Sequence, residues 1–282
     1  MPDRDSLGTR MKTYYEEVPK FRLYKRTPVA IRIDGKAFHT FTRGFKKPFD
    51  EILIKSMQQT MLYLCENIQG CVLGYTQSDE ITLILQDYKT LTTSAWFDYE
   101  IQKICSISAS MATMAFNKAF AINETKFCNS MRVEKDGSFV KEDFDLWRTY
   151  HQAEEKGAMF DARCFNIPKE EVTNLLYWRQ LDAARNSVQM VGQAYFSHKE
   201  LQNKSCSDIQ DMLMEKYNIN WNDFPTTQKR GSCAVRMTIQ NPNVDPKDGA
   251  YPREVWCIDN EIPQFKGEDR EYIEKRINFE EE

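Results

Sequence analysis

Two aspartates in this sequence stand where a strand-like run meets a turn. Asp34 ends the run VAIRID and is followed by Gly35, and Asp79 lies in the turn QSDE between two further strand-like runs. Neighbouring carboxylates repel each other, and Mg²⁺ relieves that repulsion while also binding phosphate oxygens. Two such ions about 3.5–4 Å apart activate a hydroxyl and stabilise a leaving pyrophosphate. If the fold brings the two aspartates together, they suit metal-assisted phosphoryl transfer.

The expected order of elements explains how the two aspartates meet. A strand over 29–34 is followed by a helix over 50–68 with Asp50 as its N-cap, and then by the hairpin CVLGYT and ITLIL. A second long helix from 96 to about 120 and the strand MFDARCFNI complete the series. This is the order of the split β-α-β ferredoxin-like unit, whose first and third strands are antiparallel neighbours. The fold class is therefore α+β, with a ferredoxin-like, polymerase-palm catalytic domain.

The rest of the chain is expected to add helices and a C-terminal part to this palm. The polar residues 121–158 look like an insertion, which gives a palm-like catalytic region over 1–167. Residues 168–282 form a helical and C-terminal region packed on the palm. This region is either a separate unit or part of the same domain. It begins at Pro168 with the longest helical pattern, and the later runs DIQDMLMEKY and SCAVRMTI predict a short helix and a strand.

Composition narrows the classes of protein. The chain has 282 residues, of which 41% are hydrophobic, so it can bury a large core around one active site. A net charge of −4 argues against nonspecific coating of nucleic acid but leaves room for a local basic groove. No run suits a signal peptide or a membrane span, so we expect a cytoplasmic protein without a membrane partner. Three basic clusters could line a groove: Lys20, Arg22, Lys25 and Arg26; Arg43, Lys46 and Lys47; Lys229 and Arg230.

The eight cysteines show no metal-binding spacing. They are scattered without a CxxC pair, and only three histidines accompany them, so reduced thiols are the simplest interpretation. The aspartate motifs also have a plain alternative. An Asp-Gly after a strand is usually only a turn, and Ser-Asp-Glu in a hairpin usually satisfies turn hydrogen bonds. Their expected meeting at the ends of two central strands favours the functional interpretation.

Four ordered segments carry a resemblance to a known family. IRIDGKAFHTFTRGFKKPFD, GYTQSDEITLIL, MFDARCFNIP and WRQLDAARNS together resemble the tRNA-histidine guanylyltransferase superfamily, over roughly Met11 to Arg236. These enzymes extend RNA in the 3′-to-5′ direction on a palm-like domain. The resemblance implies tRNA and nucleoside triphosphates as partners, two Mg²⁺ ions, GTP and ATP as substrates, and a homotetramer.

The resemblance also assigns roles to residues. It implies that Asp34 and Asp79 hold the two Mg²⁺ ions with the Gly35 carbonyl, and that Glu80 orients the site without ligating. His39 contacts the nucleotide or only caps its turn, while Lys47 and Lys103 match triphosphate-binding lysines or are ordinary surface residues. The implied nucleotide cradle consists of Asp34, Gly35, Lys36, Ala37, Phe38, His39, Ser78 and Asp79.

The long helix adds a further motif and a departure from the family. Arg179, Asp182 and Asn186 share one helical face, which meets RNA or forms a buried polar network. Members that add guanylate to histidine tRNA carry His-Ile-Asn-Asn where this chain reads Ala184-Arg185-Asn186-Ser187. The chain therefore looks more like the bacterial and archaeal "like-protein" branch.

The implied function is template-dependent 3′-to-5′ nucleotide addition that repairs tRNA 5′ ends. ATP activates a 5′-monophosphate, and the 3′-hydroxyl of an incoming nucleotide such as GTP attacks it. The alternatives are the classical tRNA-histidine guanylyltransferase reaction, a palm-type nucleotidyl cyclase and a catalytically silent RNA-binding protein. The absence of a GGDEF-like run weighs against the cyclase, and the presence of both aspartates weighs against the silent protein.

Overall fold

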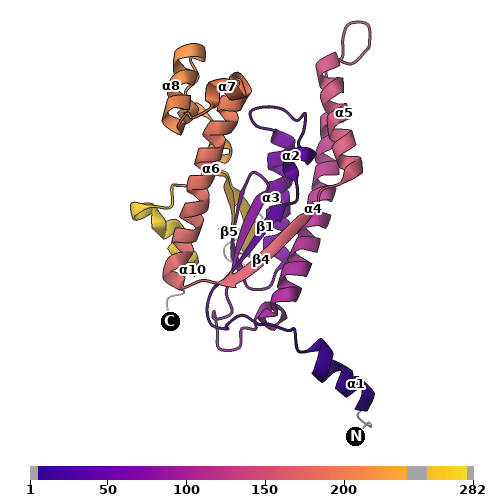
Figure 1. Ribbon diagram of the computed structural model, residues 1–282, viewed down its shortest axis with the longest axis vertical. Coiled ribbons are helices and arrows are strands. Elements are labelled where there is room, and N and C mark those ends of the chain that lie inside the picture. Colours follow the sequence, from indigo (N-terminus) through magenta and orange to yellow (C-terminus); the bar gives the residue numbers. More distant parts are fainter. Residues whose placement is uncertain (1–5, 240–252, 278–282) are drawn as a thin grey trace, which may run out of the picture.

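The centre of the molecule is an antiparallel sheet, drawn in Figure 1. We analysed a computed structural model, which describes residues 6–239 and 253–277. Within these residues the sheet has six strands in the order β4-β1-β3-β2-β5-β6. The mixed α and β architecture agrees with the predicted class. The strands are β1 (Val29–Gly35), β2 (Cys71–Gln77), β3 (Glu80–Leu85), β4 (Phe160–Asn166), β5 (Ser232–Ile239) and β6 (Arg253–Asp259).

The pairing of β1 with β3 brings the two aspartates together. The strands run antiparallel with Asp34 opposite Glu80, and the Gly35 amide donates to the Asp79 carbonyl at 3.1 Å. The expectation that the first and third strands are neighbours is therefore confirmed. Asp79 belongs to the tight turn between β2 and β3, whereas Glu80 is already the first residue of β3.

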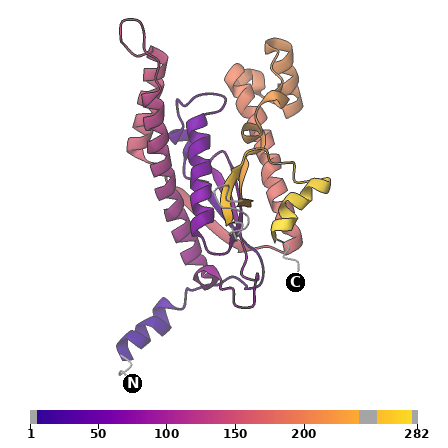
Figure 2. The same ribbon diagram turned by 180° about the vertical axis from the view of Figure 1, so that it is seen from behind.

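Two long helices cover one face of the sheet. Side chains alternate between the faces of a strand, and Val29, Ile31 and Ile33 of β1 point into the core under α3 (Glu51–Asn67) and α4 (Ile101–Asn129). Asp50 caps α3 by accepting a hydrogen bond from the Leu53 amide at 3.0 Å, as predicted. Figure 2 shows the two helices side by side.

The opposite face of the sheet is only partly covered. Helix α6 (Val172–Tyr195) packs Leu176 against Leu73 of β2 and Ile84 of β3, with α10 (Glu271–Ile277) beside it. The cover ends at the Asp34 end of β1 and the neighbouring start of β4, where the side chains of Asp161 and Arg163 are 61% and 54% exposed. This arrangement gives the sheet a covered half and an open half.

Several boundaries differ from the sequence predictions. Helix α4 runs to Asn129 instead of ending near residue 120, and at 29 residues it is longer than α6 with 24. Residues 121–158 therefore hold the end of α4 and the antiparallel helix α5 (Lys141–Lys156), whose polar side chains lie outward. Helix α6 starts at Val172, because Pro168 precedes a 3₁₀ turn at Lys169–Glu171. Strand β6 was not predicted.

The remaining elements are short. In Figure 1 the N-terminal helix projects away from the sheet, and α7 and α8 pack at the C-terminal end of α6. Among the described residues, no helix has the length and apolar character needed to cross a membrane. These elements are α1 (Ser6–Met11), η1 (Lys12–Glu16), α2 (Phe38–Phe41), η2 (Trp96–Tyr99), η3 (Lys169–Glu171), α7 (His198–Leu201), α8 (Cys206–Tyr217), η4 (Trp221–Asp223), α9 (Thr226–Arg230) and η6 (Gly267–Arg270).

Candidate active site

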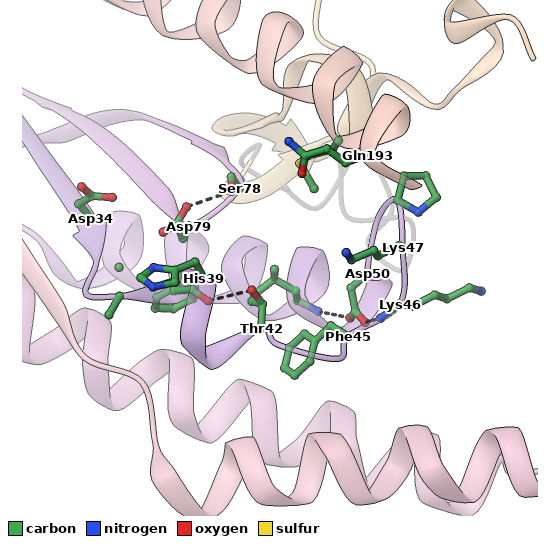
Figure 3. A pocket seen from close by; sticks show the side chains of 16 residues that line it. Asp34, His39, Thr42, Phe45, Lys46, Lys47, Asp50, Ser78, Asp79 and Gln193 are labelled. Carbon is green, nitrogen blue, oxygen red and sulfur yellow. Dashed lines mark hydrogen bonds between the residues drawn. The ribbon is translucent and has the colours of Figure 1, made fainter. Parts of the chain in front are cut away.

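A cavity of about 500 Å³ opens beside the two aspartates. Asp34 and Asp79 stand at one end of it, and Figure 3 shows both carboxylates with Ser78. Ser78 occupies the left-handed region with a φ of 50°, and its hydroxyl donates to Asp79 Oδ1 at 2.9 Å. The tight turn therefore holds the Asp79 carboxylate beside the end of β1.

The electrostatics of the pair make the ionised state of Asp79 costly. Burial raises the pKa of the Asp79 carboxyl, the Ser78 hydroxyl opposes that shift, and the Asp34 carboxylate adds to it. The Asp34 side chain is 39% exposed and lies 3.9 Å from the Arg163 guanidinium of β4. A cation that approaches both carboxylates therefore stabilises their ionised state.

The segment after β1 forms the floor of the cavity. Gly35 has no room for a side chain, because a Cβ there would lie 2.2 Å from the Phe38 ring. Ala37 adopts a positive φ of 54° and leads into the single turn α2. His39 lines the cavity, and in Figure 3 the Lys47 side chain points inward across it.

Asp50 links this floor to the helical layer. Its carboxylate accepts hydrogen bonds from the Lys46 amide at 3.0 Å and from the Tyr150 hydroxyl at 2.6 Å, in addition to capping α3. The residue therefore fixes both ends of the loop that closes the cavity. The sequence marked Asp50 only as a helix cap.

Glu80 points away from the cavity into a buried ion-pair network. Its Oε2 lies 2.8 Å from Arg32 Nη2, and its Oε1 lies 2.8 Å from Arg179 Nε. Arg179 Nη2 also lies 2.7 Å from Asp182 Oδ2, and Asp182 in turn pairs with the exposed Arg185. Of the two interpretations of the α6 motif, the buried network describes Arg179 and Asp182. It fixes β3, and with it Asp79, to α6.

The remaining predicted residues separate into three groups. Gly35, Ala37, Phe38, His39, Lys47 and Ser78 line the cavity with the two aspartates, and Asn186 lines a smaller hollow that shares Ser78 with it. Lys36 and Lys103 do not line it. Lys103 is exposed in the first turn of α4, with its ammonium 5.8 Å from the centre of the Phe97 ring. Its place as a triphosphate ligand stays a prediction.

Two residues of α6 line the cavity without having been predicted. Met190 and Gln193 stand opposite the floor, as Figure 3 shows for Gln193. They follow Asn186 at four- and three-residue spacings, so the helical period places all three on one side of α6. Extending the motif by two turns would have found them.

The donor set at this point suits a hard cation. Among residues 6–239 and 253–277, no group of three or more histidine, cysteine, aspartate or glutamate side chains could enclose a metal ion. Two carboxylates facing an open cavity fit Mg²⁺, which takes one or two protein carboxylates and completes its shell with phosphate oxygens and water. Paired aspartates beside a cavity that is also lined by lysines are typical of the class of sites that bind phosphate groups.

The comparisons with known proteins agree with this class. Residues 8–168 match the family described as tRNAHis guanylyltransferase (Thg1), which is more than half of the chain, so the chain belongs to this family. A bacterial tRNA(His) guanylyltransferase-like protein solved with ATP is 39% identical, with a TM-score of 0.76, over 97% of this chain and 99% of that one.

Two further relatives cover most of the chain. A structure with the same description, solved with GTP, is 37% identical with a TM-score of 0.74, over 98% of this chain and 100% of that one. An uncharacterized protein of Acanthamoeba polyphaga mimivirus is 29% identical over 250 residues, which is 85% of this chain and 80% of that protein.

Proposed function

We propose that this protein adds nucleotides to the 5′ end of tRNA in the 3′-to-5′ direction, copying a template base. One observation carries the proposal: Asp34 and Asp79 meet at the end of a cavity that is large enough for a nucleoside triphosphate and has Lys47 across from them. The similar proteins solved with ATP and with GTP support nucleotides of both kinds as ligands.

Asp34 and Asp79 are the residues that would hold two Mg²⁺ ions, together with the Gly35 carbonyl. When bound, these ions supply charge neutralisation and orientation of the reacting phosphates. Lys47 binds the triphosphate from the floor, and Ser78 keeps the Asp79 carboxylate in place. Arg179 acts on the site from a distance, because it holds Glu80 and therefore the start of β3.

The reaction proceeds in two in-line displacements. An oxygen of the RNA 5′-monophosphate attacks the α-phosphorus of ATP, which forms an adenylylated RNA end and releases pyrophosphate. The 3′-hydroxyl of GTP then attacks the RNA 5′ phosphorus, and AMP leaves. Neither step uses a covalent protein intermediate, so positioning and charge dominate the contribution of the protein.

The strand order β4-β1-β3-β2, with α3 and α4 on one face, supports the assignment of a ferredoxin-like palm. Since β5 and β6 continue the same sheet, we propose that the regions 1–167 and 168–282 work as one catalytic unit. By analogy within the family, we propose a cytoplasmic homotetramer.

The sequence of α6 supports templated repair over the classical reaction. Position 184 is an alanine where the classical members carry histidine, and Asn186 faces the small hollow beside Ser78. The test compares a tRNA lacking its first nucleotide with a full-length histidine tRNA, both labelled, in the presence of GTP, ATP and Mg²⁺.

We expect preferential extension of the truncated tRNA, with the incorporated nucleotide changing when the opposing template base is changed. Preference for the full-length histidine tRNA, independent of that base, would instead assign the classical reaction of the family.

A further inference from the structure

The open half of the sheet begins immediately beside Asp34. In the antiparallel pairing of β1 with β4, Asp34 lies opposite Asp161, and Arg32 lies opposite Arg163. Since residues two apart point to the same face, these four side chains lie on the face that carries α6. Asp34, Asp161 and Arg163 form an exposed patch there, with side chains 39%, 61% and 54% exposed, whereas Arg32 is 21% exposed and lies at the edge of α6. The Arg163 side chain lies 3.2 Å from Asp161 and 3.9 Å from Asp34.

Helix α6 borders this patch with an exposed aromatic side chain. Trp178 is 53% exposed, although the large apolar surface of a tryptophan side chain is usually buried. The Arg179 guanidinium lies 4.4 Å from the centre of its ring, and that of Arg32 lies 5.7 Å away. The indole therefore packs against two guanidinium groups and still keeps about half of its surface exposed.

The position of the patch relative to the cavity matters for the reaction. The nucleotide cavity extends from the aspartates toward the floor segment and the C-terminal end of α6, where Met190 and Gln193 lie. Neither Arg163 nor Trp178 lines it. In an in-line displacement, the attacking and leaving groups stand on opposite sides of the phosphorus. In the activation step the RNA phosphate oxygen attacks opposite the leaving pyrophosphate, and the open half of the sheet is the side of the aspartates that the nucleotide cavity does not occupy.

The chemistry of the patch suits the end of an RNA strand. Arginine binds phosphate through a planar fork of donors, and its pairs with Asp161 and Asp34 are solvent-exposed and weak enough to exchange. An exposed indole is a stacking surface for a nucleobase, without preference for sequence. One phosphate contact next to one stacking contact matches a 5′-terminal nucleotide that carries a 5′ phosphate.

We propose that Arg163 and Trp178 form the docking site for the 5′-terminal nucleotide of the RNA substrate. Arg163 binds the 5′ phosphate beside Asp34, and Trp178 stacks on the terminal base. This inference rests on the proposed function for its substrate, but it concerns RNA binding and is testable without catalysis.

The experiment measures binding of a tRNA transcript lacking its first nucleotide, labelled at the 3′ end, by fluorescence anisotropy in the absence of nucleotide. Each protein is titrated with two forms of the RNA, one with a 5′ monophosphate and one with a 5′ hydroxyl. Isothermal calorimetry of GTP without RNA is the second measurement. The variants are Arg163→Ala, Arg163→Lys, Trp178→Ala and Trp178→Phe.

Matched controls come from exposed residues far from the site. Arg148→Ala removes an arginine of similar exposure, which pairs with Asp145 at 3.2 Å as Arg163 pairs with Asp161. Phe139→Ala removes an aromatic side chain that is 50% exposed. Both controls should bind the two RNA forms and GTP as the wild type does.

We expect the wild type to prefer the 5′-phosphorylated RNA, and Arg163→Ala to lose that preference through about tenfold to hundredfold weaker binding. Arg163→Lys should restore part of it. Trp178→Ala should weaken both RNA forms by about fivefold or more, and Trp178→Phe should weaken them less. GTP binding should stay unchanged in all four variants, because neither residue lines the nucleotide cavity.

Three results would overturn the proposal. The first is equal binding of both RNA forms by the wild type, and the second is an unchanged preference in Arg163→Ala. The third is weaker GTP binding in Arg163→Ala with unchanged RNA binding, which would assign the patch to a nucleotide's own phosphates. A phosphate preference that disappears in Arg163→Ala supports the docking site even if no nucleotide addition is found, so the two proposals fail separately.

Discussion

Replacing Arg179 should destabilise the protein far more than replacing an exposed arginine. Arg179 is only 4% exposed and Glu80 6%, and the two pair at 2.8 Å beneath the active site. Removing one partner of a buried ion pair costs about 3–5 kcal/mol, because the other charge stays buried. Glu80 keeps Arg32 at 2.8 Å, so we place Arg179→Met at the lower end of this range, about 3 kcal/mol.

Urea denaturation followed by circular dichroism measures this loss. A loss of that size corresponds to a fall in melting temperature of about 6–12 °C for a chain of comparable length. Arg148→Met, which breaks an exposed pair, should change the free energy of unfolding by no more than about 0.5 kcal/mol. The double variant Glu80→Gln/Arg179→Met should lose less than the sum of the single variants, since neither member of the Glu80–Arg179 pair then leaves the other's charge buried beside it. If Arg179→Met unfolds within about 1 kcal/mol of the wild type, the network does not fix β3 to α6 as argued.

Two further predictions concern the cavity. Burial raises the pKa of Asp79, so the folded protein binds that proton more tightly than the unfolded chain, and the associated stability is lost as the pH rises through the raised pKa. Asp79→Asn should therefore stabilise the metal-free protein at neutral pH, and this gain should shrink as the pH falls through the raised pKa and vanish below the ordinary carboxyl pKa. Urea denaturation across this pH range would show no such trend if the Asp79 charge were well solvated. Lys47→Ala should raise the KM for GTP about tenfold to hundredfold and leave the KM for RNA unchanged. Steady-state kinetics measures this, with Lys55→Ala as the control. If the two lysine variants behaved alike, Lys47 would not bind the triphosphate.

The strand order was accessible to sequence reasoning because local patterns and chain topology agree. The apolar run ending at Asp34 could only be a buried strand, and the hairpin around Asp79 was marked by polar residues between two β-branched runs. Topology then made the two strands neighbours. The helix cap at Asp50 followed from its side-chain type alone.

Other features depend on contacts that no local pattern contains. The sequence around Glu80 does not indicate that its carboxylate forms ion pairs with Arg32 and Arg179, because these residues come from three separate elements, β1, β3 and α6. The end of α4 was missed because its last turns bury polar side chains: Asn123 donates to Ser56 of α3, and Glu124 lies 3.6 Å from His151 of α5. Strand β6 was missed because it pairs only at the edge of the sheet with β5, where alternating burial is weak.

The most direct test of the account is incorporation of labelled GTP at the 5′ end of a truncated tRNA by the wild type, Asp34→Ala and Asp79→Ala. The wild type should add the nucleotide only when Mg²⁺ is present, and both variants should add none while unfolding at urea concentrations no lower than the wild type. Continued addition by either folded variant would contradict the claim that the meeting of Asp34 and Asp79 is the catalytic centre.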